Sequence, residues 1–173
     1  DSNVLSFTAA PDFEAPTDLN GDNAYVVVLS VSDGTDSVDQ TVTITVTDAY
    51  EGRVIDGPIS GSTVFIDLDG DFTQDTEEPS GTTDSTGAFV VAKATAAAGV
   101  VPKLISIGGT DTTTNEALPD LALVADVPSA AASSAYITPI STVIAAAATV
   151  EEKAKVLESL GVTATDLGSA DNA

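Results

Sequence analysis

The residues with the clearest capacity for chemistry lie between Ile66 and Thr86, in the segment IDLDGDFTQDTEEPSGTTDST. The segment is rich in carboxylates, several at alternate positions, and glycines there let the backbone turn tightly. Its acidic residues are Asp67, Asp69, Asp71, Asp75, Glu77, Glu78 and Asp84. Calcium takes about six to eight oxygen ligands, which side chains and backbone carbonyls around a tight turn supply. The sequence therefore predicts a calcium-binding loop.

The spacing inside this loop follows the ligand order of an EF-hand loop. The candidate ligands, in that order, are Asp67, Asp69, Asp71, the backbone carbonyl of Thr73, Asp75 and a bidentate Glu78. Two features differ, because Gly70 comes earlier than the EF-hand glycine and a predicted strand, not a helix, precedes the loop. The alternative is a solvated acidic turn, but adjacent carboxylates repel one another without a cation, which favours calcium. Magnesium fits less well, since it demands octahedral geometry and retains its waters.

A shorter segment, Asp18-Leu19-Asn20-Gly21-Asp22-Asn23, repeats the same alternation. Asp18, Asn20 and Asp22 are candidate ligands of a second calcium ion. Asp, Asn and Gly also gather in ordinary turns for backbone reasons, so both interpretations stay open.

The composition is strongly acidic, with 27 acidic and 5 basic residues among 173 and a formal charge of -22. Such a surface repels nucleic acid and anionic lipid, and its self-repulsion is relieved by cations or salt. The chain contains no His, Cys, Met or Trp. Disulfides, thiolate metal sites and the usual catalytic bases and nucleophiles are therefore missing, and we do not expect an enzyme.

Three β-strands are predicted in the first part of the chain, over residues 4–8, 24–32 and 38–47. The last two alternate apolar and polar residues and are joined by Asp33-Gly34-Thr35-Asp36, which predicts a hairpin with one buried face. We expect Asp33, Asp36 and Asp39 to lie in the turn or at the surface. Three strands fall short of the roughly seven of a complete immunoglobulin-like sandwich.

Residues 3–48, NVLSFTAAPDFEAPTDLNGDNAYVVVLSVSDGTDSVDQTVTITVTD, resemble the C-terminal half of a bacterial cadherin-like repeat from large calcium-dependent adhesins. The resemblance implies that an Asp-x-Glu motif, Asp12 and Glu14, and the strand-terminal Asp48 ligate calcium between repeats. The family's Asx-rich linker is replaced here by Ala49-Tyr50-Glu51-Gly52, where Glu51 is a substitute ligand.

The second region opens with a strand and turn over residues 52–61. Further strand signals follow at residues 62–66, 88–92, 104–107 and 121–125, separated by Gly, Pro, Thr and Asp. This spacing predicts a second small sandwich. Residues 51 to about 142, which include the run GRVIDGPISGSTVFIDLDGDFTQDTEEPSGTTDSTGAF, are similar to the prealbumin-like calcium-binding modules of bacterial surface adhesins.

Two helices are predicted near the C-terminus. Thr138-Pro139 provides an N-cap and first position, and Thr149 with Glu152 forms a capping box for a helix that ends at Gly161. The expected apolar face of the second helix contains Val150, Ala154, Leu157 and Leu160. Thr165-Asp166 is a further cap signal.

Together these signals predict a mainly β fold: an incomplete cadherin/Ig-like sandwich at 1–50, a prealbumin-like calcium-binding β-sandwich at 51–136 and a helical hairpin within 137–173. We expect a calcium-stabilised structural or adhesion segment of a bacterial cell-surface or extracellular matrix protein. Its partners would be neighbouring repeats or copies of itself. The alternatives are a filament subunit that polymerises by β-strand complementation and, ranked lowest, a carbohydrate- or peptide-binding module.

The expected location is extracellular, because the Ala, Thr, Ser, Asp and Val bias suits a secreted bacterial surface protein. No signal peptide is visible at Asp1, and no uncharged run reaches the ~20 residues of a membrane span. We therefore expect an interior piece of a longer polypeptide.

Overall fold

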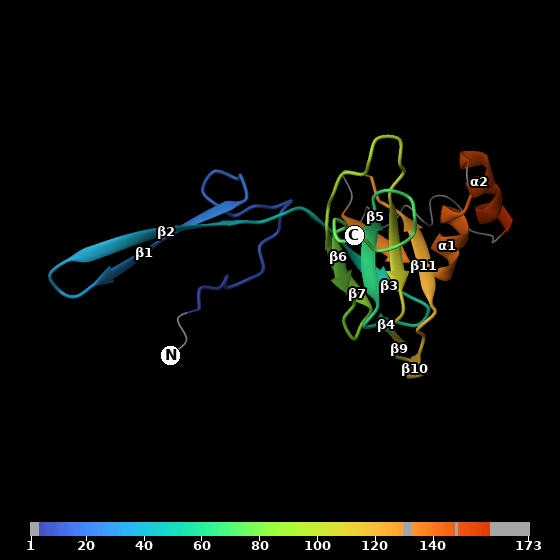
Figure 1. The fold of residues 1–173 in the computed structure, drawn as a ribbon, viewed down its shortest axis with the longest axis horizontal. Coiled ribbons are helices and arrows are strands. Elements are labelled where there is room, and N and C mark those ends of the chain that lie inside the picture. The colour runs from blue at the N-terminus through green and yellow to red at the C-terminus, as the bar shows by residue number, and fades with distance from the viewer. Residues whose placement is uncertain (1–3, 130–132, 148, 160–173) are drawn as a thin grey trace. The chain divides into compact units, whose positions relative to one another are not determined.

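The computed structural model describes residues 4–129, 133–147 and 149–159 (Figure 1). The chain divides into two compact units, unit 1 over residues 1–48 and unit 2 over residues 49–173. The fold is mainly β, with two helices near the C-terminus, as the sequence predicts. Ala49 and Tyr50, expected in the first region, open the first strand of unit 2.

Unit 1 contains one antiparallel hairpin. Strand β1 (Ala24–Ser32) pairs with β2 (Ser37–Thr45) in an unbroken register that runs from Ala24 opposite Thr45 to Ser32 opposite Ser37. At the turn, the Asp33 carboxylate accepts hydrogen bonds from the N–H groups of Thr35 and Asp36, both at 2.9 Å. The hairpin and its acidic turn confirm the sequence prediction.

The strand predicted over residues 4–8 is wrong, since no β-structure forms there. A strand requires a neighbour to which its backbone can hydrogen-bond, and in the described part of unit 1 β1 and β2 pair only with each other. Residues 4–8 instead contact the hairpin through the ring of Phe7. Phe7 meets Tyr25 edge to face, with ring centroids 5.0 Å apart.

The prediction that one face of the hairpin is buried is also wrong. Alternation in β2 does place Val38, Val42 and Ile44 on one face of the hairpin. Tyr25 and Ile44 on that face are only half-buried, however, and Val31 and Val38 are each 73% exposed. No large hydrophobic side chain in the described part of unit 1 is buried. The pattern indicates which face is apolar, but burial also requires a second layer of structure, which the described part of unit 1 does not supply.

Unit 2 is built from two main sheets that share one core. The first has the strand order β11 (Ala122–Asp126), β8 (Lys103–Ile107), β5 (Thr63–Asp67), β6 (Ser80–Thr82). The second has the order β12 (Ser134–Ile137), β3 (Ala49–Val54), β7 (Ala88–Ala92). A small third sheet joins β10 (Glu116–Ala117), β9 (Thr110–Asp111) and β4 (Ile59–Ser60).

The core of unit 2 draws side chains from both main sheets, which makes the pair a small sandwich. Its buried members are Tyr50, Val54, Ile59, Val64, Ile66, Phe89, Val91, Leu104, Leu123, Ala125, Ala135 and Ile137. Strand β5 lies at the centre of this packing, because Val64, Phe65 and Ile66 are all fully buried. Burial on both sides explains why β5 is a continuous apolar run rather than an alternating one.

Strand β12 pairs in parallel with β3. Neither this strand nor its pairing was predicted from the sequence. Its pairing places Ala135 opposite Gly52. A Cβ added at Gly52 would stand 1.7 Å from the Ala135 carbonyl oxygen, so only glycine permits this approach.

Both predicted helices form, and both predicted starts are confirmed. Helix α1 (Pro139–Ala145) has Thr138 as its N-cap. Helix α2 (Val150–Ser159) begins with a capping box, in which the Thr149 N–H donates to the Glu152 carboxylate and the Glu152 N–H donates to the Thr149 hydroxyl.

The apolar face predicted for α2 is wrong at Ala154, which is exposed. The helix turns Leu157 into the unit as its buried residue, flanked by the half-buried Lys153 and Val156. Lys153 forms an ion pair with Asp126, so this face of the helix is turned toward β11. The Val150 side chain and the predicted features at Leu160, Gly161 and Thr165-Asp166 lie outside the described residues.

Candidate metal centre

The candidate metal centre lies where β5 runs into the loop that leads to β6. Asp67, Asp69 and Asp71 each place a carboxylate oxygen within 4.8 Å of the other two. Asp67 ends β5 and is 1% exposed, whereas Asp69 and Asp71 are exposed. We call these three residues the Asp trio. The trio thus has one carboxylate at the core and two that face water.

Backbone N–H groups of the loop hold the three carboxylates in place. Those of Gly70 and Phe72 donate to the two oxygens of Asp67, at 2.6 and 3.2 Å. The Asp71 N–H donates to Asp69 at 3.1 Å. Gly70 and Phe72 both have positive φ, 89° and 62°. This left-handed backbone, which favours glycine at the first position, lets the chain coil around the Asp67 side chain.

Glu78 lies at the far end of the loop, buried and bonded to backbone. Its two carboxylate oxygens accept hydrogen bonds from the N–H groups of Leu68, at 2.7 Å, and Asp75, at 3.1 Å. Neither Asp75 nor Glu78 belongs to the mutually close carboxylate group. The predicted bidentate ligand therefore holds the loop together, and its carboxylate faces the loop backbone.

Lys103 lies opposite Asp67 in the register of β5 with β8, but its ammonium pairs with Asp126 and forms no ion pair with the Asp trio. Among the described residues, ion pairs join Lys103 and Lys153 to Asp126, and none reaches the trio. Two unit charges 4 Å apart repel by about 1 kcal/mol in water and about 4 kcal/mol near a protein surface. The oxygen-only donor set, and carboxylates that no ion pair among the described residues neutralises, fit a hard divalent cation such as calcium.

The second candidate site, Asp18, Asn20 and Asp22, is knit together by its own hydrogen bonds. Asp18 accepts from the N–H groups of Asp22 and Asn23, and the Asn20 amide donates to Asp22 at 2.7 Å. Desolvation acts to raise the pKa of Asp18, but the backbone hydrogen bonds outweigh it and the pKa lies below its ordinary value. These contacts are those of an Asx-type turn.

The residues that the cadherin resemblance implies, Asp12, Glu14 and Asp48, do not gather into a group of three close carboxylates in the part of the chain that the structure describes. The Asp12 carboxylate accepts hydrogen bonds from the N–H groups of Glu14, at 2.9 Å, and Ala15, at 3.2 Å. Asp12 thereby shapes its own turn within unit 1.

The three tyrosines have different surroundings in their own units. Tyr50 is buried, and the Lys93 ammonium lies 5.0 Å from its ring centroid. Tyr25 packs against Phe7 in unit 1, and Tyr136 is 53% exposed on β12. A carbohydrate-binding surface of stacked aromatic rings gains no support from this arrangement.

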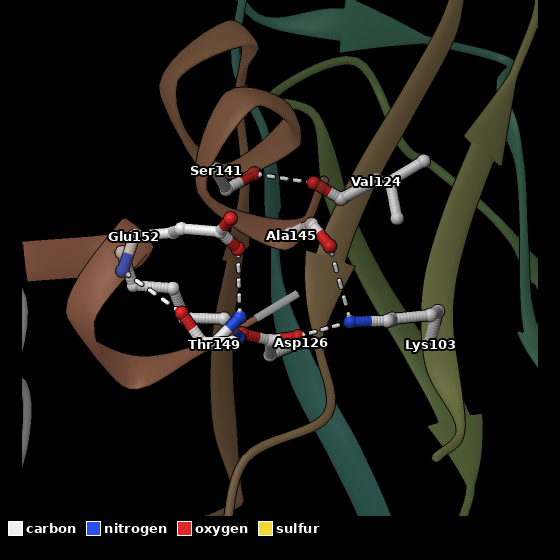
Figure 2. A network of polar contacts seen from close by, with 8 residues as sticks. Lys103, Val124, Asp126, Ser141, Ala145, Thr149 and Glu152 are labelled. Carbon is white, nitrogen blue, oxygen red and sulfur yellow. Dashed lines mark hydrogen bonds and ion pairs between the residues drawn. The ribbon is translucent and has the colours of Figure 1, made fainter. Parts of the chain in front are cut away.

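The sequence did not predict a polar network around Asp126 (Figure 2). It lies in the same sheet as Asp67, because Lys103 is the residue opposite both Asp67 and Asp126. Asp126 on β11 pairs with Lys103 on β8, at 2.5 Å, and with Lys153 on α2. Lys103 also donates to the Ala145 carbonyl at the end of α1, at 3.4 Å. Two of the five basic residues of the chain bind this one carboxylate. Their scarcity in the sequence was the one signal that could have drawn attention to them.

Comparison of the chain with family models, with curated proteins and with solved structures found no match. None of the helices in the described ranges has the length and apolar character needed to span a membrane.

Proposed function

We propose that this protein is a calcium-stabilised structural or adhesion segment of a bacterial cell-surface or extracellular matrix protein, without catalytic activity. The observation that carries the proposal is the Asp trio, three carboxylates within 4.8 Å of one another with Asp67 buried at the end of a central strand. The resemblance to cadherin-like and prealbumin-like modules supports the extracellular setting.

The position of the trio explains how an ion would act on the whole unit. Asp67 continues directly from β5, whose residues fill the centre of the core. The Asp67 side chain also organises the loop backbone through Gly70 and Phe72. A cation bound there neutralises a buried charge and fixes the loop to the sheet. Its role is to stiffen the fold, and it takes no part in a reaction.

The proposal is tested by thermal melting of the chain in millimolar calcium and in chelator. Because calcium binds the folded state preferentially, the melting temperature rises with calcium concentration. Asp69→Ala removes one ligand and shrinks this rise, while Asp120→Ala, an exposed acid outside the trio, leaves it unchanged. The proposal would be contradicted if the melting temperature of the wild-type chain were the same in calcium and in chelator.

A second candidate function is self-assembly by β-strand complementation, and the hairpin of unit 1 favours it. Strand β1 carries no charged residue and no proline, and its register with β2 has no bulge. Such an edge lacks the devices that normally block strand addition. Its apolar side chains are exposed, with Val28 at 56% and Val31 at 73%. A strand from a neighbouring copy would extend this sheet.

This second candidate is tested by sedimentation velocity at increasing protein concentration. Strand complementation predicts association that Val28→Pro abolishes, because proline cannot donate to a ladder and distorts the edge. Thr43→Pro on β2 tests the other edge of the hairpin, since it abolishes association if neighbouring copies pair with β2. A monomer at all concentrations in calcium contradicts self-assembly and leaves the calcium proposal intact.

A further inference from the structure

Helix α1 fits against the outer edge of β11, where another strand would otherwise pair. In the four-stranded sheet, β11 is an end strand with β8 on one side. On its other side the structure places α1, which also contacts β12 of the opposite sheet (Figure 1). The edge that could accept a strand is thus covered by a helix.

The side chains of α1 replace the backbone partners that a strand would bring. The N–H of Val124 donates to the Thr142 hydroxyl at 2.8 Å. The Ser141 hydroxyl donates to the Val124 carbonyl at 2.8 Å, as Figure 2 shows. Both outward backbone groups of Val124 are therefore satisfied by two adjacent hydroxyls. A neighbouring strand would use these same two groups.

The same hydroxyls are built into the start of α1. The Thr142 hydroxyl donates a hydrogen bond to the Thr138 carbonyl at 2.9 Å, and the Ser141 hydroxyl accepts one from the Thr138 N–H at 2.8 Å. Each hydroxyl thus serves the helix and the strand edge together. The hydroxyls that stabilise the start of the helix therefore also cover the edge of β11.

Polar contacts, more than buried surface, hold this cover in place. Helix α1 contains no buried residue, and Leu157 is the buried residue in the described part of α2. The remaining attachment is the ion cluster of Asp126 with Lys103 and Lys153, together with the bond from Lys103 to Ala145. A cover held by so few apolar contacts opens locally at modest free-energy cost.

We propose that α1, steadied by α2, is an edge cover that keeps β11 from pairing with β11 of a second copy of this chain. The occupant is a second copy because β11 has no proline and alternates exposed and buried residues, the pattern needed for antiparallel self-pairing. The acidic charge of the chain opposes such pairing, and the cover adds the specific block.

The test uses the full chain with Thr142→Val, which keeps the shape of residue 142 but removes the acceptor for the Val124 N–H. Hydrogen exchange at Val124 is expected to accelerate about fivefold to tenfold, the factor that corresponds to one net hydrogen bond. Thr142→Ser keeps the hydroxyl and restores slow exchange. Ser159→Ala, which removes a hydroxyl of α2 that bonds within its own helix, is the matched control.

Self-pairing is read from spin labels, which the absence of native cysteine makes straightforward. A label at Ala122→Cys on β11 reports pairing at this edge, and a label at Val28→Cys reports pairing at the hairpin. Since β11 is five residues long, labels on two paired copies lie within about 20 Å. The expected result is a short distance between labels at residue 122 in Thr142→Val and none in the wild type or in Thr142→Ser.

Two outcomes would overturn the proposal. One is Thr142→Val with no association: with slow exchange at Val124 the hydroxyl does not guard the edge, and with fast exchange the opened edge does not pair with a second copy. The other is association of Thr142→Val with short distances only between labels at residue 28. In that case assembly occurs through unit 1, and β11 needs no cover.

Discussion

The carboxylate of Glu78 accepts a hydrogen bond from the N–H of Leu68 at 2.7 Å and so closes the acidic loop across ten residues. Glu78 is 7% exposed, which is unusual for a glutamate. Its second oxygen accepts from the Asp75 N–H. The two ends of the loop are therefore fastened by one side chain. Asp69 and Asp71 lie on the segment between them, and Asp67 comes directly before it.

Glu78→Gln is expected to destabilise unit 2 by about 1–3 kcal/mol in the absence of calcium. The substituted amide keeps one acceptor oxygen, but its NH2 group faces a backbone N–H that needs an acceptor, which leaves a buried donor unsatisfied. Urea unfolding in chelator measures the loss. The neighbouring Glu77→Gln, at an exposed position, is the control and is expected to change stability by less than about 0.5 kcal/mol.

Gly52→Ala is expected to be among the most damaging single substitutions, costing roughly 3 kcal/mol or more. The new Cβ would meet the Ala135 carbonyl at 1.7 Å, so β12 must move away from β3, and overpacking of this kind strains the backbone. Gly99→Ala has open space around the added Cβ but a φ of +88°, and is expected to cost about 1–2 kcal/mol from backbone strain alone. Equal losses in thermal melts of the two variants would refute the steric explanation.

Acid is expected to loosen α2 from β11. Partial burial acts to raise the pKa of Asp126, but hydrogen bonds and charges of Lys103 and Lys153 outweigh it, so the pKa lies below its ordinary value of 3.8. A group with a lowered folded pKa stabilises the fold above its unfolded pKa, and this contribution is lost as the pH falls through the folded pKa. The attachment should therefore hold at neutral pH and weaken below about pH 4.

Hydrogen exchange of the α2 amides between pH 3 and pH 6, corrected for intrinsic rates, measures this loosening. Asp126→Asn is expected to show weak protection of α2 across the whole range and little further change on acidification. Glu158→Gln, at an exposed position on the same helix, should follow the wild-type profile. If Asp126→Asn loses α2 protection on acidification as the wild type does, another group controls the attachment.

Monovalent salt is expected to raise the melting temperature in chelator. The chain carries a formal charge of -22, and residues 1–48 contain no basic residue at all. Screening of this self-repulsion strengthens as the Debye length falls from about 30 Å at 0.01 M to about 3 Å at 1 M ionic strength. Melts in potassium chloride, with tetramethylammonium chloride as a second salt, separate screening from specific ion binding. A melting temperature that falls or stays constant contradicts the prediction.

The calcium response should shrink as this salt increases, because screening and a bound ion relieve part of the same repulsion. In Asp69→Ala the effect of monovalent salt is expected to persist, while the calcium-specific rise is reduced. This contrast separates general screening from binding at the Asp trio in a single series of melts.

Local signals in the sequence were sufficient where one segment determines its own structure. Alternation and the Asp-Gly turn specified the β1–β2 hairpin, and Thr138-Pro139 and Thr149 with Glu152 specified the helix starts, because capping groups and turn residues act within a few positions. The alternation of Asp67, Asp69 and Asp71 likewise identified the trio, since a tightly turned loop brings such neighbours together.

Contacts between distant segments were decided only by the tertiary structure. The parallel pairing of β12 with β3 joins strands that are more than seventy residues apart. Glu78 has a ligand's position in the loop pattern, yet its geometry turns both oxygens to backbone N–H groups. Alternation in the hairpin could predict an apolar face but not whether another segment packs on that face, and burial depends on such packing. For the same reason, the pairing of Thr142 with Val124 has no trace in the sequence.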